Sequence, residues 1–407
     1  MTDPNDIYEK YDVPRVINAV GNHTRVGGSL IRPEAREAMA NAADDFAELS
    51  ELQARASELI SQACDADAGY VTNGAASGLA LATAACLARD DFATMDRLPD
   101  TTGVPDEVLV PTAHHIEYDR AFRLPGATLR PVGLIDNHDG AEQVKPWEIA
   151  DAISEETAAF AYIERPRNEL SLEAVVEVTD QHDIPVIVDA AAELPPQSNL
   201  TKYVDCGAAA VVFSGGKAVR GPQPTGIVAG DQWLIRSIAL QHLPVDTPAE
   251  FWDPPEELID TTVLPSGTPN YGLGRAMKVG KEEIAGLVRA LELFLDEDED
   301  EVVESWRRRA NRLADELSDL GEIHADLSGD DRSDYRSVPT VDIRIEASSP
   351  SGAADLVRQL RNDRPRIIVG ERHVEDGWIT LDPRCLRDDQ IAVIVDRIRA
   401  IVCSEQS

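Results

Sequence analysis

Residues 211–223 read VVFSGGKAVRGPQ, an apolar run followed by a turn of small residues that presents a single lysine, Lys217. The run is typical of a buried strand in a parallel sheet. Lysine is scarce in this chain, and an amine held at the end of an apolar strand loses its proton more easily than one in water. Such an amine can form an imine with a carbonyl compound. Lys217 is therefore our candidate for a covalent catalytic lysine.

A second apolar run, upstream of the first, ends in a lone carboxylate. Residues 184–192 read IPVIVDAAA, which places Asp189 where a parallel strand would open into a site crevice. Pyridoxal phosphate requires a lysine for its aldehyde and an acid that keeps its ring nitrogen protonated. Lys217 and Asp189, on consecutive strands, therefore predict a pyridoxal-phosphate site.

Each of these residues also has an ordinary structural explanation. Asp189 could cap the helix that follows it, and Lys217 could be a solvated loop residue. A nucleotide phosphate loop does not fit this lysine, because Ala218 stands where serine or threonine is required and Val211 where the first glycine is required.

A turn of small residues lies near residue 75. Residues 70–78 read YVTNGAASG, a short strand and a turn that lead into an expected helix at 79–88. Backbone N–H groups at the start of such a helix bind anions, so we expect the cofactor phosphate here. The same residues are also explained as a tight turn before a close-packed helix.

Two histidines, His114 and His115, follow the strand expected at 107–111. A planar ring stacked on the cofactor would limit its tilt and exclude water from one face. The sequence leaves open which histidine does so, and the pair is also explained as a loop feature. No third ligand lies nearby to complete a zinc site, so we expect no metal.

The composition disfavours nucleic-acid-binding proteins and favours a salt-adapted cytoplasmic protein. The 407 residues carry a formal net charge of −36, which disfavours a nucleic-acid partner because phosphate contacts require clustered lysine and arginine. So acidic a surface repels itself in dilute buffer and less so in concentrated salt, which predicts a salt-adapted protein. The five cysteines are widely spaced and indicate a reducing compartment. With neither a secretory signal nor a membrane span expected, we predict a cytoplasmic protein.

Strand-like and helical patterns alternate along the chain, as in an α/β protein. We expect two domains: an N-terminal segment with a large cofactor-binding α/β domain at 1–270, and a smaller C-terminal α/β domain at 271–407. Long helices are expected at 272–292 and 300–320.

Several segments in the same order resemble one family from about residue 13 to residue 401. The chain is similar to the fold-type-I pyridoxal-phosphate enzymes of the selenocysteine synthase type, and within them to the D-glucosaminate-6-phosphate ammonia-lyase branch. The segments that carry this resemblance are RVINA at 15–19, TRVGGS at 24–29, VTNGAA at 71–76, YDRA at 118–121, PVIVDAA at 185–191, SGGK at 214–217 with GPQ at 221–223, and MKVGKEE at 277–283.

The resemblance implies an aspartate aminotransferase-like fold with a large mixed, mostly parallel sheet, and a homodimer or larger homo-oligomer. It implies Lys217 as the cofactor lysine and Asp189 as the partner of the ring nitrogen. The phosphate ligands that it implies are Thr72, Asn73, Gly74, Ala75, Ala76, Ser77 and Ser214, with Thr268 of Gly267–Thr268 reaching over from the neighbouring subunit. The substrate ligands that it implies are Arg25, Arg372 and Arg366.

The chain departs from the family pattern at Val20, His23, Asn73 and Ser77, which puts the substrate in doubt. We expect a lyase that removes ammonia from a sugar-derived amino acid such as D-glucosaminate 6-phosphate, with Lys217 as general base that also assists loss of the β-hydroxyl. The alternatives are a seryl-tRNA selenium transferase, a racemase, aldolase or β-replacement enzyme, and a non-catalytic protein that binds pyridoxal phosphate.

Overall fold

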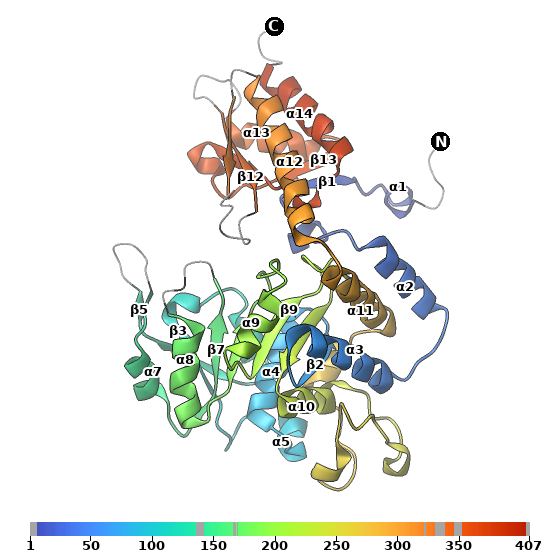
Figure 1. The fold of residues 1–407 in the computed structure, drawn as a ribbon, viewed down its shortest axis with the longest axis vertical. Coiled ribbons are helices and arrows are strands. Elements are labelled where there is room, and N and C mark those ends of the chain that lie inside the picture. The colour runs from blue at the N-terminus through green and yellow to red at the C-terminus, as the bar shows by residue number, and fades with distance from the viewer. Residues whose placement is uncertain are drawn as a thin grey trace. The chain divides into compact units, whose positions relative to one another are not determined.

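The protein is described by a computed structural model that covers residues 6–135, 142–165, 168, 170–320, 323–329, 338–345 and 352–403. The chain divides into two compact units. The large unit comprises residues 31–296, and the small unit comprises residues 1–30 together with 297–407. Figure 1 shows the two units and the labels of their elements.

The large unit is built on a seven-stranded sheet in the order β2-β10-β9-β8-β7-β3-β4. Its strands are β2 (Ala68–Thr72), β3 (Glu107–Pro111), β4 (Thr128–Val132), β7 (Thr157–Ile163), β8 (Val186–Asp189), β9 (Ala210–Ser214) and β10 (Gly226–Gly230). Strand β10 is antiparallel to both neighbours, and the pairs from β9 to β4 are parallel. The sheet is therefore mixed and mostly parallel, as expected. A short hairpin, β5 (Leu134–Ile135) and β6 (Glu142–Gln143), follows β4.

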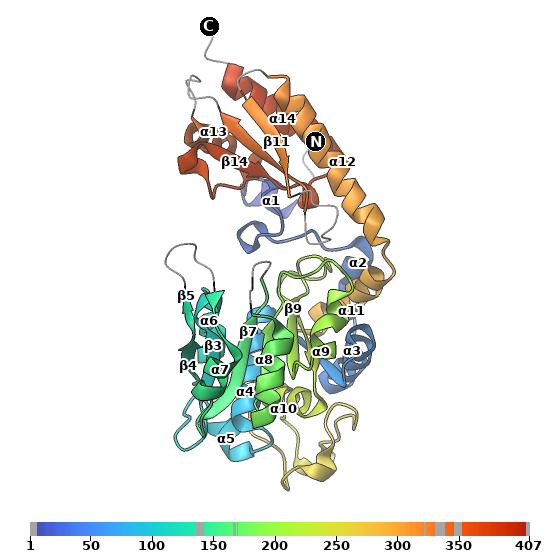
Figure 2. The ribbon, with the colours of Figure 1, turned by 60° about the vertical axis from the view of Figure 1, so that its left-hand side comes forward.

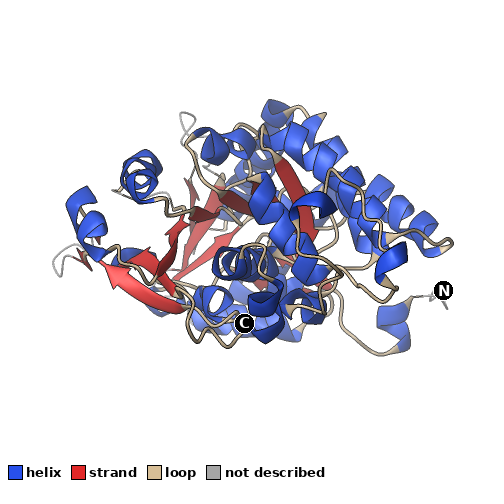
Figure 3. Ribbon diagram, turned by 90° about the horizontal axis from the view of Figure 1, so that it is seen from below, coloured by secondary structure: helices blue, strands red, loops and turns tan. Residues whose placement is uncertain are grey.

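Helices cover both faces of this sheet, because its central strands are mostly apolar and bury side chains on both sides. In β9, Val212 packs toward one cluster of helices, whereas Val211 and Phe213 pack toward the other. The first cluster contains α4 (Ala75–Ala88), α5 (Phe92–Arg97) and α10 (Gln232–His242). The second contains α3 (Leu49–Cys64), α7 (Pro146–Ala152), α8 (Leu172–Thr179), α9 (Asn199–Asp205) and α11 (Lys281–Leu295). Figure 3 shows the strands between helices. Helices α2 (Pro33–Ala43) and α6 (Asp119–Arg123) complete the unit.

The small unit contains a three-stranded antiparallel sheet and a parallel strand pair. The sheet is formed by β11 (Ile323–Ser328), β12 (Thr340–Ile345) and β14 (Trp378–Leu381), and the pair by β1 (Val16–Ala19) and β13 (Arg366–Val369). Its helices are α1 (Ile7–Lys10), α12 (Glu299–Ser318), α13 (Ala353–Asn362) and α14 (Asp388–Cys403). Figure 2 gives a second view of these elements.

The observed units differ from the expected domains at both boundaries. The N-terminal segment, which we expected with the large domain, belongs to the small unit, because β1 pairs with β13 and buries Ile17 and Ala19 in the core of that unit. Helix α11, which we expected in the C-terminal domain, belongs to the large unit, because Ile284 and Leu287 join its core.

The helix expected at 272–292 begins only at Lys281. Residues 273–277 form a 3-10 turn instead, η6 (Leu273–Met277). The carbonyl of Met277, which an α-helix would use internally, lies 3.1 Å from Nε2 of the buried His242 on α10. Tertiary hydrogen bonding therefore replaces the first turns of the expected helix.

In the part of the chain that the structure describes, every helix is too short or too polar to cross a membrane.

The acidic surface leads to a prediction about salt. The melting temperature should rise by several degrees between 0.1 M and 2 M KCl, because each 1 kcal/mol of relieved repulsion raises it by roughly 2–4 °C in domains of this size. Scanning fluorimetry at increasing KCl concentration would measure the rise. A melting temperature that stays constant or falls with KCl would contradict salt adaptation.

Candidate active site

The predicted cofactor residues follow strands whose carboxyl ends lie at one edge of the large sheet. Asp189 ends β8, Ser214 ends β9 and Thr72 ends β2. Gly226, the first residue of the antiparallel β10, is in register with both Thr72 and Ser214, which fixes these two ends at the same level. Ligands of open α/β sheets bind outside the carboxyl ends of the strands. The topology therefore brings together residues that lie more than 140 positions apart in the sequence.

Asp189 is a buried carboxylate at this edge, with 7% of its surface exposed. Its Oδ1 accepts a hydrogen bond of 3.0 Å from the backbone N–H of Ala191. Burial raises the pKa of Asp189 above the ordinary value, while the Ala191 hydrogen bond and the positive charges of Lys217 and Arg165 act in the opposite direction. Both cations are therefore close enough to act on this carboxylate, as a pair of lysine and acid around one cofactor requires.

Lys217 lies in a tightly closed turn after β9. The backbone N–H of Gly215 donates to the carbonyl of Thr225 at 2.9 Å, and that of Gly221 donates to the carbonyl of Gly215 at 2.9 Å. The carbonyl of Lys217 itself accepts a hydrogen bond from the N–H of Arg220 at 3.2 Å. The backbone that carries the lysine is therefore held at several points, which favours a fixed position for the amine.

Replacing Gly216 with alanine should disturb this turn. A Cβ atom there would lie 2.6 Å from Cα and 2.7 Å from the carbonyl oxygen of Gln223, and neither backbone atom can rotate away. We expect a loss of about 1–3 kcal/mol in the free energy of unfolding and weaker binding of pyridoxal phosphate, measured by urea unfolding and by titration. Gly352→Ala is the control, because a Cβ at residue 352 meets nothing within 4 Å. Equal effects of the two variants would contradict the prediction.

The expected phosphate turn leads into α4, a helix of 14 residues whose N-cap is Gly74. Gly74 has a φ of 84° and makes no side-chain cap, so the N–H groups of Ala75, Ala76 and Ser77 begin the helix without a capping side chain. Open space surrounds the position of a Cβ at residue 74. A phosphate is well matched to such a helix start. The side chain of Asn73, by contrast, is engaged with the carbonyl of Lys278 at 3.1 Å.

The two histidines have different environments. His114 is fully buried, lies edge-on to Tyr162 with ring centroids 4.9 Å apart, and accepts a hydrogen bond from the N–H of Ile163 at Nδ1. His115 is one-third exposed, and its Nδ1 lies 2.6 Å from Oδ2 of Asp119. A ring without exposed surface cannot stack on a cofactor, so the geometry argues against His114 and favours His115.

Arg165 is a site residue that our sequence analysis did not identify. Its guanidinium donates to three successive carbonyls, those of Ala113, His114 and His115, at 2.9, 3.3 and 3.3 Å, and its charge acts on Asp189. It follows the end of β7 at the carboxyl edge, as Lys217 follows the end of β9. A cation directly after a buried strand is the sequence feature that would have indicated it.

The remaining predicted residues belong to the small unit or to a loop of the large unit. Arg25, Arg366 and Arg372 belong to the small unit, where Arg25 pairs with Glu371 at 3.4 Å and the other two are exposed. Their role as substrate ligands stays a prediction, as does that of Thr268, which lies in the loop before η6. A further arginine of the small unit, Arg384, binds the carboxylate of Asp382 through two nitrogens and joins the candidates.

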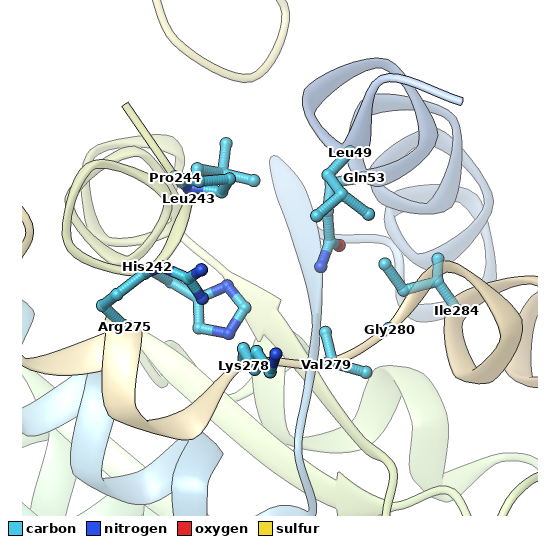
Figure 4. A pocket seen from close by; sticks show the side chains of 10 residues that line it. All are labelled: Leu49, Gln53, His242, Leu243, Pro244, Arg275, Lys278, Val279, Gly280 and Ile284. Atoms are coloured by element: carbon cyan, nitrogen blue, oxygen red, sulfur yellow. The ribbon is translucent and has the colours of Figure 1, made fainter. Parts of the chain in front are cut away.

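A cavity of about 210 Å³ lies beside β2, at the edge of the sheet (Figure 4). Its lining residues are Leu49, Gln53, His242, Leu243, Pro244, Arg275, Lys278, Val279, Gly280 and Ile284. The Gln53 amide bonds both the N–H and the carbonyl of Val71, which satisfies the open edge of β2. His242 is likewise engaged on both nitrogens, by Tyr70 and Met277. None of the predicted cofactor residues lines this cavity, so the cavity does not mark the predicted cofactor site.

The chain is similar in sequence and in structure to known proteins. No family model matches the chain. Over 407 aligned residues it is 30% identical to the D-glucosaminate-6-phosphate ammonia lyase of Salmonella typhimurium, and the alignment covers 98% of both chains. The chain belongs to the D-glucosaminate-6-phosphate ammonia-lyase family. A solved structure of D-glucosaminate-6-phosphate ammonia-lyase matches 100% of both chains with a TM-score of 0.80 at 28% identity.

More distant similarities extend the comparison. An L-seryl-tRNA(Sec) selenium transferase of Nitratidesulfovibrio vulgaris is 26% identical over 95% of this chain and 81% of its own length. A solved NifS-like protein has a TM-score of 0.54 at 16% identity, which shows the fold alone. The predicted family, the fold-type-I architecture and the pyridoxal-phosphate cofactor are thereby confirmed, and the protein is a pyridoxal-phosphate-dependent enzyme.

The residues at the carboxyl edge fit this cofactor. A buried acid, a lysine whose charge reaches it and an open helix start with uncapped N–H groups are the three elements that a ring nitrogen, an aldehyde and a phosphate require. Asp189, Lys217 and the first turn of α4 would hold them.

Proposed function

We propose that the enzyme is an ammonia-lyase that converts a 2-amino-2-deoxy sugar acid, such as D-glucosaminate 6-phosphate, into a 2-keto-3-deoxy acid and ammonia. The similarity to an ammonia lyase over 98% of both chains carries the proposal. The selenium transferase relative is longer than the matched region, since the chain covers 81% of it. The strongly negative net charge of −36 also disfavours a tRNA substrate.

The chain's own residues divide the work of this reaction. Bound pyridoxal phosphate supplies an electron-withdrawing ring that makes the α-proton of the attached amino acid acidic. Lys217, once displaced by the substrate amine, takes this proton at Nζ as general base. Asp189 holds the proton on the ring nitrogen, and the N–H groups of Ala75 to Ser77 bind the phosphate. The tight turn of Lys217 keeps the amine in place between these steps.

The test is a titration of the purified holoenzyme in molar KCl with D-glucosaminate 6-phosphate and with D-glucosaminate. We expect the cofactor absorption band to shift and keto acid and ammonia to appear in equal amounts. A shifted band without keto acid would indicate other chemistry on the same cofactor, such as racemisation, aldol cleavage or β-replacement. An unchanged band with both compounds would reject this substrate class, and comparison of both compounds shows whether the substrate phosphate matters.

We also propose a homodimer or larger homo-oligomer in which Thr268 reaches the phosphate of a second copy. The segment before η6 exposes Phe251, Val263 and Tyr271, each more than half accessible. Large exposed apolar side chains gathered in one segment are typical of an interface. Light scattering after gel filtration would measure the assembly, and a monomer in the presence of cofactor would reject it.

A further inference from the structure

The side chains of His115 and Asp119 form a pair that stacking of His115 on the cofactor does not by itself explain. Nδ1 of His115 lies 2.6 Å from Oδ2 of Asp119, while Oδ1 of Asp119 accepts the backbone N–H of Ile116 at 3.1 Å. The Asp119 side chain is 12% exposed and that of His115 is 33% exposed. Because both carboxylate oxygens are engaged, the carboxylate cannot rotate, and it fixes the imidazole that binds it.

This pair follows β3 at the same edge of the sheet as the buried acid of the cofactor site. Arg165 donates to the carbonyl of His115 at 3.3 Å, and the charge of the same guanidinium acts on Asp189. The same arginine thus binds the backbone of His115 and, against the larger effect of burial, lowers the pKa of the carboxyl group that would hold the ring nitrogen. His115 therefore lies at the carboxyl edge of the sheet, after β3. Strand β7 separates β3 from β8, which carries Asp189.

The carboxylate determines which nitrogen of His115 exchanges protons. Nδ1 faces a carboxylate, which only accepts, so Nδ1 carries a hydrogen. Nε2, on the opposite side of the ring, is then the position that gains or loses a proton. In carboxylate–histidine pairs the acid fixes the tautomer and the orientation of the ring. The pair is thus built to hold a proton at Nε2 and to release it.

We propose that His115 is the general acid that protonates the departing β-hydroxyl and that Asp119 is its positioning residue. This proposal rests on the proposed lyase function. Lys217 takes the α-proton, the electrons of the Cα–H bond form the Cα–Cβ double bond, and the Cβ–O electron pair leaves with oxygen. That oxygen takes the Nε2 proton and departs as water, leaving His115 neutral. Hydrolysis then releases ammonia and the keto acid, so that no oxidant or reductant is required.

The decisive comparison uses two substrates that differ in whether the leaving group needs a proton. Hydroxide must be protonated to leave, whereas chloride leaves unassisted. In the Asp119→Asn holoenzyme we expect kcat on D-glucosaminate 6-phosphate and on D-serine to fall about 10²–10⁴-fold, the usual size of general acid catalysis. Elimination from β-chloro-D-alanine should be unchanged. A purely structural role of Asp119 would slow all three reactions alike and would overturn the proposal.

Asparagine is the informative substitution because it keeps one contact and changes the other. Its oxygen can still accept the N–H of Ile116, which preserves the local fold, while its amide then presents a donor to Nδ1 and favours the opposite tautomer. Proton–nitrogen correlation spectra of the histidine-labelled protein should show this change at His115. The exposed His373, near Asp376 at 3.6 Å, serves as the internal reference that stays constant.

Further variants keep the proposal testable if Asp119→Asn does not fold. His115→Gln retains a side-chain donor toward Asp119 but exchanges no proton and removes the ring that would stack on the cofactor. With saturating cofactor we expect turnover of the hydroxyl substrates to fall at least tenfold more than elimination from β-chloro-D-alanine. Asp396→Asn removes an equal charge from an exposed site on α14 and should change nothing. A wild-type enzyme that releases keto acid from D-serine but not from D-glucosaminate 6-phosphate would reject the proposed substrate and leave the general acid testable. A wild-type enzyme that eliminates from none of the three substrates would overturn both proposals.

Discussion

Replacement of Lys217 with alanine should abolish turnover and covalent capture of the cofactor. The substitution removes both the amine that binds the aldehyde and the general base, so we expect kcat to fall by more than about 10⁴-fold, since acid–base catalysis alone reaches that factor. Borohydride reduction followed by mass spectrometry of peptides should attach one reduced cofactor to the wild-type peptide that contains Lys217 and none to the variant. The fold should persist, because Lys217 lies on a turn held by backbone hydrogen bonds.

Lys10→Ala is the control for this experiment, because Lys10 is an exposed lysine of the short helix α1. It should leave labelling and turnover unchanged. Reductive labelling of a lysine other than Lys217 in the wild type would overturn the assignment of the catalytic lysine.

Replacement of Asp189 with asparagine should lower activity and, without cofactor, raise stability. Asparagine cannot keep a proton on the ring nitrogen, so we expect a fall of about 10²–10⁴-fold in kcat, the range of acid–base contributions. Burial raises the pKa of Asp189, so the folded protein binds this proton more tightly than the unfolded chain does. Ionisation of Asp189 at neutral pH therefore weakens the fold, and an amide of the same shape avoids that cost.

The pH dependence gives the sign of this effect. The destabilisation by Asp189 is fully present above its raised folded pKa and fades as the pH falls toward about 4, the ordinary value for an aspartate. Denaturant unfolding of cofactor-free protein should thus show Asp189→Asn more stable than wild type at pH 8, with the difference shrinking at pH 5. Asp151→Asn, at an exposed position of α7, should show no such difference. A less stable Asp189→Asn protein at pH 8 would contradict the prediction.

The elements of the large sheet were predictable because each is a short, continuous property of the chain. The runs that end at Asp189 and Ser214 are apolar at every position, which only a strand buried on both faces accommodates. The consecutive order of these strands made Asp189 and Lys217 a pair, and the parallel topology now places both at one edge. The local sequence pattern predicted the wrong element where a backbone group bonds to a distant residue. The carbonyl of Met277, for example, bonds to His242 and lies outside the α-helix that the pattern predicted.

The division of roles between similar neighbours could not be predicted from the sequence. His114 and His115 are adjacent and identical, yet one is fully buried against Tyr162 and the other is paired with Asp119. Likewise, the sequence places Arg165 after a buried strand but does not show which groups it binds. Its importance follows from three carbonyl partners and one carboxylate that the fold brings to it.

The sequence by itself therefore determined the alternation of strands and helices, the negative net charge, and the candidate lysine and acid of the cofactor site, since these depend on side-chain type and short-range periodicity. Only the tertiary structure decided that β1 joins the small unit, that His115 and Asp119 form a pair, and that Arg165 binds the backbone of His115. The reason is physical: burial, hydrogen-bond partners and the field of neighbouring charges arise between segments distant in the chain, and no local pattern encodes them.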